Sequence, residues 1–350
     1  MEEGTLLVKP DIKKYKLKDD IERYYIDTYE KLYWIVDERF KEQKKKYPDA
    51  EPIIDLSRLV ICIQNGLRIS PFSLESLCVK ISGIIDLKDK TKSVPTELDV
   101  ESGKDEFQIE VKYEINFGYS IIYLMQFNYI KFLKYVNFSG TQFLDLVWIR
   151  DSVFFEDVCF DENDINQNIE YNCKLPVDIG GIMFIDNLFK KRVTFNRENW
   201  NSGAKISFSR NTYEGDVSFM MCSFSDYNGF YYDLSRSVFK GNVVIDCNKY
   251  NNEDLYGNTL FSHVNFCGSY FHKEFSILNA IIGEISMQKC YFDDTVNISN
   301  NKYNASSSLD FSYSTINSLL FIGRNFDLIN SQPNKLAEFK RIMQLHCNPN

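Results

Sequence analysis

The octapeptide VTFNRENW, residues 193–200, recurs in outline as ISFSRNTY at residues 206–213 and as VSFMMCSF at residues 217–224. Each copy begins with an aliphatic residue, a small polar residue and a large apolar residue, and an aromatic side chain follows five residues after the large one. Three copies in so short a stretch form an internal repeat. An internal repeat is considered first, because its period indicates the fold class.

The five-residue step extends over residues 138–326. An amphipathic helix repeats every 3.6 residues and a half-buried strand every two, so neither explains a step of five. We therefore predict a chain that turns a corner after each step and buries one large side chain per step. The predicted repeat core comprises Phe138, Phe143, Phe195, Trp200, Phe208, Tyr213, Phe219, Phe224, Phe266, Phe271, Phe292, Tyr303, Phe311 and Phe321.

Smaller side chains complete each step. An aliphatic residue lies two positions before many of the large side chains, as Val217 does before Phe219, and the residue between them is mostly polar. This alternation is that of a short strand with two side chains on its inner face. Before the second member of a pair, the inner position is usually small or an amide, as at Asn211 and Asn248. We expect these two amides to stack, as amides do in cross-β assemblies.

Four such steps would close a coil of about 21 residues, so the repeat predicts about nine coils. Coils that pair as parallel strands at about 4.8 Å would give a rod of about 43 Å. Many pairs lie six rather than five residues from the next pair, which predicts bulged corners. The repeat loses phase at about residues 161–180 and 225–233, and we expect loops in both places.

These repeats resemble those of the pentapeptide-repeat proteins, in particular the variety centred on phenylalanine. The resemblance covers about residues 115–326 and rests on VNFSGTQFLDL, VTFNRENW, ISFSRNTY, VSFMMCSF, VNFCGSYF, ISMQKCYF, VNISNNKY and LDFSYSTI. It implies a mainly β fold, a right-handed parallel β-helix solenoid with a quadrilateral cross-section.

The sequence divides into three parts. Residues 1–110 are predicted to form a mixed α+β domain with a helix from Asp19 to Lys46, and the charge run KKK at its end indicates a solvated helix end. Residues 111–330 are the predicted β-helix. Residues 331–350 are predicted to form a C-terminal capping helix, because the open ends of a solenoid need caps.

Some proteins that resemble this variety continue past such a helix into a membrane-spanning region. We therefore expect membrane contact only if the chain continues past Asn350. The N-terminal stretch MEEGTLLVKP has no apolar h-region and so is not a secretory signal. Nine cysteines without a CxxC pair indicate reduced thiols, and we expect a cytoplasmic protein.

Few residues suggest chemistry. His263, Cys267 and His272 form a loose H-x3-C-x4-H string, but a zinc site usually needs four converging ligands, so we expect no metal site. Cys222 and Cys290 occupy the small inner position of the repeat, where a thiol acts as a small hydrophobe.

The adjacent acids Glu156-Asp157 and Asp293-Asp294 are predicted to lie at corners without a shared phase, where they aid solubility rather than catalysis. GxGxxG, GxxxxGK[ST] and GxSxG are absent from the sequence. We therefore expect no cofactor and no enzyme activity, and a β-helix carbohydrate-active enzyme is the third of three alternatives.

The rod carries the excess charge. Residues 138–330 contain 24 acidic and 15 basic residues, a net charge of −9, which equals that of the whole chain. Basic residues are scattered, so we do not expect direct nucleic-acid binding. Some proteins that the repeat resembles are acidic rods that mimic DNA and bind type II topoisomerases, and binding or protecting such an enzyme is the second alternative.

The first alternative is a non-catalytic protein-interaction scaffold built on the β-helix. Its flat outer faces would present side chains to a protein partner, which the sequence does not name. The N-terminal domain would supply specificity or the contacts of a homo-oligomer. This interpretation depends on fold resemblance and on the lack of a chemical motif, so it is associational.

Overall fold

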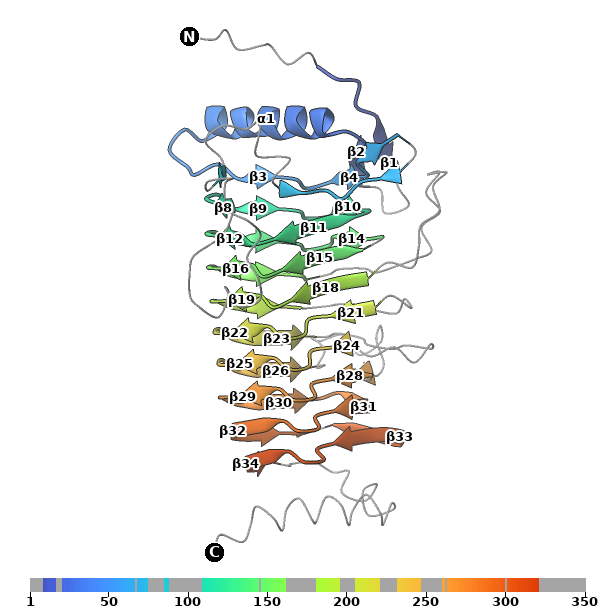
Figure 1. Ribbon diagram of the computed structural model, residues 1–350, viewed down its shortest axis with the longest axis vertical. Helices are drawn as coiled ribbons and strands as arrows, with labels where there is room; N and C mark the ends of the chain where they lie inside the picture. Colours follow the sequence, from blue (N-terminus) through green and yellow to red (C-terminus); the bar gives the residue numbers. More distant parts are fainter. Residues whose placement is uncertain are drawn as a thin grey trace, which may run out of the picture.

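The computed structural model shows parallel strands stacked into a rod, with a helix across one end (Figure 1). The residues that it describes are 9–16, 21–66, 68–74, 85–87, 109–144, 146–161, 181–195, 205–220, 232–246, 260–261, 263–299 and 301–320. The predicted capping helix at 331–350 lies outside these residues, as do Trp200, Phe224 and Phe321, and of Tyr303 only the backbone is described.

The strands of the rod fall into four columns, which we call faces 1 to 4 in chain order. Face 1 contains β4 (Leu59–Ile61), β10 (Ile121–Ile122) and β14 (Gln142–Phe143). Face 2 contains β11 (Met125–Asn128), β15 (Val147–Arg150), β18 (Gly181–Ile185), β21 (Lys205–Ser207), β24 (Tyr232–Asp233), β28 (Val264–Asn265), β31 (Ile281–Ser286) and β33 (Lys302–Asp310). β27 (Leu260–Phe261) pairs with the start of β31.

The other two faces join into one sheet. Face 3 contains β8 (Ile109–Val111), β12 (Ile130–Phe132), β16 (Val153–Phe154), β19 (Leu188–Phe189), β22 (Thr212–Tyr213), β25 (Val238–Phe239), β29 (Tyr270–Phe271), β32 (Tyr291–Asn297) and β34 (Thr315–Leu320). Face 4 contains β3 (Ile54–Asp55), β9 (Ile115–Asn116), β13 (Val136–Asn137), β17 (Val158–Cys159), β20 (Val193–Thr194), β23 (Val217–Met220), β26 (Val243–Asp246) and β30 (Phe275–Leu278), followed by the second halves of β32 and β34.

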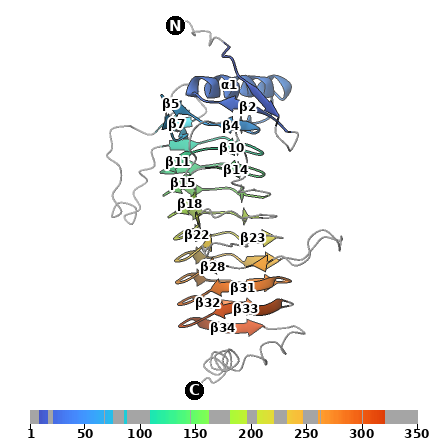
Figure 2. The same cartoon turned by 90° about the vertical axis from the view of Figure 1, so that its right-hand side faces the viewer.

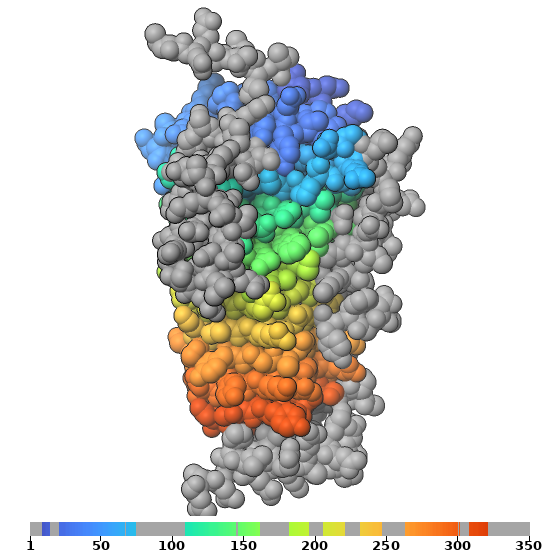
Figure 3. Space-filling view, in the orientation of Figure 1, coloured from blue at the N-terminus to red at the C-terminus, as the bar shows by residue number. Residues whose placement is uncertain are grey.

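Within each face, every strand pairs in parallel with the strand one turn of the chain away. Figure 2 shows these turns as layers beneath the helix, and in the space-filling view they follow one another as bands of colour along the rod (Figure 3). The stacked parallel columns are consistent with the predicted β-helix.

Large side chains fill the interior as ladders with one ring per turn. In face 3, the rings of Phe132, Phe154, Phe189, Tyr213, Phe239, Phe271 and Phe292 follow one another at centroid distances of 4.6 to 5.0 Å and interplanar angles of 4° to 8°. Parallel strands impose a spacing of about 4.8 Å. Because parallel rings at that distance are offset, each pair contributes about 0.5–1.5 kcal/mol beyond its buried area.

Face 4 has a second ladder of rings, formed by Phe117, Phe138, Phe160, Phe195 and Phe219. Of the repeat-core residues named from the sequence, ten have described side chains and all ten are buried: Phe138, Phe143, Phe195, Phe208, Tyr213, Phe219, Phe266, Phe271, Phe292 and Phe311. The strand pattern of residues 217–219 is in–out–in, because Val217 and Phe219 are buried and Ser218 is not.

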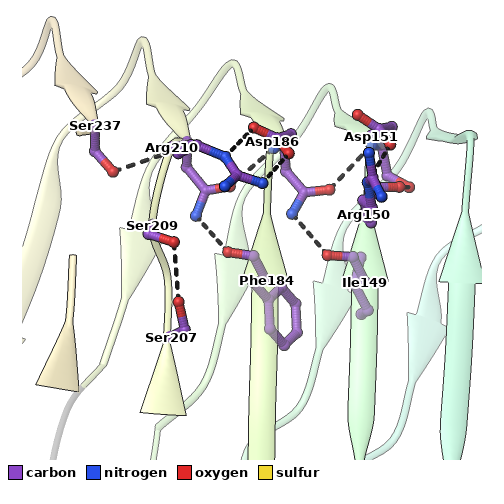
Figure 4. Close-up of polar contacts among 12 residues, drawn as sticks. Ile149, Arg150, Asp151, Phe184, Asp186, Ser207, Ser209, Arg210 and Ser237 are labelled. Atoms are coloured by element: carbon purple, nitrogen blue, oxygen red, sulfur yellow. Dashed lines mark hydrogen bonds and ion pairs between the residues drawn. The ribbon is translucent and has the colours of Figure 1, made fainter. Parts of the chain in front are cut away.

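A polar ladder lines the corner between faces 2 and 3, formed by Ser152, Asn187, Asn211, Ser237, Ser269, Cys290 and Ser314. The side chains of Asn187, Asn211, Ser237, Ser269 and Ser314 each accept from the backbone N–H of the member one turn before, as Asn211 does from Asn187 at 2.8 Å. The Cys290 thiol instead donates to the carbonyl of Phe266. The Asn211 amide also donates to the carbonyl of Phe184 at 2.8 Å (Figure 4). Of the two amides named from the sequence, Asn248 lies outside the described residues, and the neighbours of Asn211 in the ladder are Asn187 and Ser237.

The residue before each ladder member adopts left-handed backbone. These residues are Asp151, Asp186, Arg210, Arg236, Gly268, Lys289 and Tyr313, with φ between 50° and 72°, and Tyr129 adopts the same conformation at this corner one turn before Asp151. A left-handed residue reverses the chain direction sharply, which makes the corner, and the buried hydrogen bonds of the ladder offset its strain.

Turns near both ends of the rod have the predicted 21 residues, as between Ile115 and Val136 and between Tyr270 and Tyr291, but the turns in the middle are longer. Along the polar ladder, hydrogen-bonded neighbours lie 35, 24, 26 and 32 residues apart from Ser152 to Ser269. The extra residues fall between face 4 and face 2, at 162–180, 196–204, 221–231 and 247–259, which lie outside the described residues. The expected nine coils in residues 138–326 are therefore too many. Most of the loop predicted at 225–233 is also outside, but Tyr232 and Asp233 form β24.

The helix begins later than the sequence suggests. The predicted helix from Asp19 is wrong over its first part, where β2 (Glu22–Ile26) pairs with β1 (Lys14–Lys16) and β4 instead. The reason is local, because ERYYI is rich in strand formers and Thr28 caps the helix α1 (Tyr29–Lys46) by accepting from Lys31. The helix ends at Lys46, as the sequence predicts.

Helix α1 covers the first turn and provides hydrogen-bond partners for the backbone groups at its free strand edge. Arg39 donates to the carbonyls of Asp55 at 3.0 Å and Ser57 at 2.8 Å, and Gln43 accepts from the N–H of Ile53 at 2.7 Å. These backbone groups would otherwise present an open strand edge, which invites edge-to-edge association. The helix therefore caps this end of the rod.

The sheets of the rod begin before residue 111. β3 pairs with β9 in face 4, and β4 pairs with β10 in face 1, so residues 54–61 form part of the first turn. Three antiparallel pairs of described strands flank this end: β1 with β2, the hairpin of β5 (Gln64–Asn65) with β6 (Arg68–Ile69), and β7 (Ile85–Leu87) beside β8. The region predicted as a separate α+β domain thus shares its sheets with the rod.

Candidate functional site

The outer side of face 3 carries two columns of side chains over four successive turns. Because side chains alternate along a strand, the residues on either side of each buried ring point outward. The first column is Thr212, Val238, Tyr270 and Tyr291, and the second is Glu214, Lys240, His272 and Asp293. We call these eight side chains the tyrosine face.

Aromatic and acidic groups converge in the last two turns of the tyrosine face. Tyr270 stacks on Tyr291 with ring centroids 5.8 Å apart and lies 4.4 Å from the His272 ring. The Tyr270 hydroxyl lies 2.9 and 2.8 Å from the two carboxylate oxygens of Asp293, and His272 Nδ1 lies 3.2 Å from one of them. The hydrogen bond to Asp293 raises the pKa of Tyr270, so the phenol stays a neutral donor.

The charges in the second column are paired within the face. Lys240 lies 3.0 Å from Glu214, and Asp293 is held by Tyr270 and His272. Tyr291 is 54% exposed although it is a large aromatic residue. The tyrosine face is therefore a platform of fixed aromatic and aliphatic groups beside a column of charged side chains that are held by contacts within the face.

The left-handed corner lies directly beside the first column. Arg210 is held by Asp186 through two contacts of 2.8 and 2.7 Å (Figure 4). One turn further, the side chain of Arg236 passes over Gly268, where an added Cβ would lie 3.7 Å from Arg236 Cγ. Lys289 follows on the next turn, and both Arg236 and Lys289 are exposed.

A second candidate is an open groove of about 650 Å³ near the helix end of the rod. It is lined by Glu51, Pro52, Ile53, Glu114, Lys134, Tyr135, Glu156, Asp157 and Lys191. Lys134 pairs with Glu51 at 2.8 Å and Arg192 with Asp157 at 3.0 Å. Burial raises the pKa of Glu114 and also that of Tyr135. The mixture of signs favours no single ligand.

The histidines named from the sequence lie at separate places. His263 is 4.0 Å from Glu284, whereas His272 contacts Asp293 on face 3. Across the described part of the chain, no three His, Cys, Asp or Glu side chains converge in a way that could hold a metal ion. Cys290 is buried, and burial raises its pKa to about 12, so it is a thiol rather than a thiolate at neutral pH.

The adjacent acids also separate. Glu156 and Asp157 line the groove at the helix end, whereas Asp293 belongs to the tyrosine face near the other end. The sequence analysis missed the cluster around Asp293. The sequence feature that could have predicted the cluster is the pair of tripeptides YFH at residues 270–272 and YFD at residues 291–293. The two occupy the same position in the repeat and lie one turn apart.

Comparison with known proteins gives no relative. The chain matches no protein-family model, and no curated protein or solved structure matches it significantly. Among the residues that the structure describes, no helix has both the length and the apolar composition needed to cross a bilayer.

Proposed function

We propose that the chain is a right-handed quadrilateral β-helix of the pentapeptide-repeat type and that it acts as a non-catalytic protein-interaction scaffold. The four strand columns support the repeat type, and so do the ladders on faces 3 and 4, each with one ring per turn. The right hand is the one that parallel crossover connections strongly favour. A crystal structure at moderate resolution would test the hand directly.

The exposed stack of Tyr270 and Tyr291 is the observation that carries the binding role. Tyrosines dominate binding energy at protein interfaces, because they bury a large area while losing little conformational freedom. Here the loss is smaller still, since Asp293 and the neighbouring turn already hold Tyr270 in place. A partner would thus meet a preorganised surface.

The alternative role as a DNA mimic has less support. Residues 138–330 carry 24 acidic and 15 basic residues, so the net charge of −9 is spread over the whole rod and interspersed with cations. Duplex DNA carries one negative charge for about every 1.7 Å of axis. A supercoiling assay with a type II topoisomerase, with and without a quinolone, tests this role, and inhibition or protection by the protein would favour it over the scaffold.

Site-specific photocrosslinking tests the scaffold role. A benzophenone amino acid would replace Tyr291 in one variant and Tyr47 in another, in the cells that make the protein. Tyr47 is the matched control, because it is 55% exposed against 54% for Tyr291 but lies at the end of helix α1.

We expect a discrete crosslinked protein from position 291 and none from position 47. A product with the mass of two copies would identify the partner as a second copy of the chain. The proposal fails if position 291 gives no product, or if both positions give the same products.

A further inference from the structure

We infer that the tyrosine face and the corner beside it bind an acidic segment of a partner protein, one that carries aromatic residues and lies extended along the rod. The inference rests on the proposed function and adds the chemistry of the partner. Three observations support the inference: two exposed cations, the exposed aromatic side chains and the spacing of the turns.

The cations are Arg236 and Lys289, on the turns before and after Gly268. Both are exposed, and neither has an ion pair with any residue that the structure describes. Arg210, one turn before Arg236, is by contrast held in a bidentate pair by Asp186. Two such cations on a chain of net charge −9 are a local reversal of sign, which favours an anionic partner.

The carboxylates of the tyrosine face do not oppose such a partner. Asp293 accepts from Tyr270 and contacts His272, and Glu214 pairs with Lys240. Glu214 is thus paired with a cation, whereas Asp293 keeps its negative charge but has its oxygens occupied by the Tyr270 hydroxyl and by His272. An incoming acidic segment meets the uncompensated charge at the corner.

The spacing of the turns defines the pattern of acidic residues. Arg236 and Lys289 lie two turns apart, about 9.6 Å at the usual strand spacing. A polyproline II segment repeats every three residues and rises about 9.3 Å in that repeat. Acidic residues three positions apart would therefore reach both cations. An aromatic residue between them would lie beside Gly268, which has no side chain of its own and over which the Arg236 side chain passes.

Fluorescence anisotropy with a labelled peptide of Glu-Tyr-Pro repeats tests the inference. A peptide of Lys-Tyr-Pro repeats and an oligothymidylate serve as competing probes. The informative variant is Arg236→Asn with Lys289→Asn, because asparagine tolerates left-handed backbone and removes the charge without adding strain. The matched control is Lys191→Asn with Lys273→Asn, which neutralises two exposed lysines at the corner of faces 3 and 4.

We expect the wild-type protein to bind the Glu-Tyr-Pro peptide at low salt. The variant at Arg236 and Lys289 should bind it about tenfold more weakly, and the control within about twofold of wild type. Tyr291→Ala should also weaken binding, and added salt should weaken it in the wild type more than in the charge variant.

The inference fails if the Glu-Tyr-Pro peptide does not bind, if the Lys-Tyr-Pro peptide binds as tightly, or if the two double variants lose affinity equally. Tighter binding of oligothymidylate would also overturn it, in favour of a nucleic-acid ligand. If position 291 crosslinks a partner while the peptide does not bind, the scaffold role stands and the acidic partner does not.

Discussion

Replacing Asn211 by alanine should destabilise the rod by about 4 kcal/mol, because two buried backbone groups lose their partners. The Asn211 side chain accepts from the N–H of Asn187 at 2.8 Å and donates to the carbonyl of Phe184 at 2.8 Å. All three residues are at most 2% exposed, so water cannot replace the missing bonds without opening the corner.

The magnitude follows from the two orphaned groups. Leaving one buried donor or acceptor unsatisfied costs about 1–3 kcal/mol, and Asn211→Ala leaves one of each on the backbone, besides the buried Tyr213 hydroxyl to which Asn211 donates at 3.2 Å. Domains of ordinary stability unfold at about 5–15 kcal/mol, so this single change removes a large share of the total.

Asn211→Ser is the matched control. Serine occupies the same ladder position at Ser237, where its hydroxyl accepts from Asn211 at 3.2 Å and donates to the carbonyl of Phe208 at 3.3 Å. A serine at position 211 can therefore serve both groups with longer bonds, and we expect it to cost about 1–2 kcal/mol. Alanine and serine differ by one hydroxyl, so the comparison isolates the hydrogen bonds from the loss of volume.

Urea denaturation followed by circular dichroism gives the change in unfolding free energy, and hydrogen exchange gives the local effect. The backbone amide of Asn187 should lose protection in the alanine variant and keep most of it in the serine variant. Equal destabilisation by alanine and serine would refute the reasoning, and so would a loss below about 1 kcal/mol in the alanine variant.

Three further changes test the close approach of the turns, the cap and the groove. Gly215→Ala should lower the free energy of unfolding in urea by more than about 3 kcal/mol, because the new Cβ would clash with the carbonyl carbon of Lys191. The control Gly66→Ala, which has open space around it, should cost about 1 kcal/mol. Similar costs for the two variants would contradict the clash. Arg39→Met leaves two edge carbonyls without donors, so it should lower stability by about 2 kcal/mol and speed hydrogen exchange in the first turn more than at the far end. Burial raises the pKa of Glu114 in the folded protein, so the stability that this carboxyl contributes is present below the unfolded pKa and is lost as pH rises through the folded pKa. Glu114→Gln should therefore raise the melting temperature at neutral pH but not at acidic pH. An equal gain at both pH values would contradict the burial argument.

The interior of the rod follows from local sequence. In VTF, Val193 and Phe195 are buried and Thr194 is not, and the same alternation recurs along face 4. Size and alternation alone decide which side chains point inward, so one turn can be interpreted without knowledge of its neighbours. The same reasoning assigns Cys290 to a small inner position, where it is fully buried.

The contacts between turns could not be predicted in the same way. They depend on the number of residues per turn, which varies from 24 to 35 along the polar ladder between Ser152 and Ser237. Asn211 therefore faces Ser237, and no local pattern contains that information. The cluster around Asp293 was missed for the same reason, because it joins side chains from consecutive turns.

The start of helix α1 was missed for a different reason. Residues 19–28 fit a helical spacing of apolar side chains, but residues 22–26 form β2, which pairs with β1 and β4. A short amphipathic stretch satisfies both periods, and tertiary pairing decides between them. Thr28, whose side chain caps the helix, was the local signal of the true boundary.

The polar ladder at the corner of faces 2 and 3 allows the number of turns in the rod to change while the cross-section of the rod stays the same. Each rung bonds to its neighbour through one backbone N–H and one small side chain, so removal of residues 187–210 would bring Asn211 opposite Ser152 with the same donor and acceptor. Whole turns can thus be gained or lost by duplication or deletion within a gene. Such a protein can change its length in evolution while the side chains on its faces stay aligned from turn to turn.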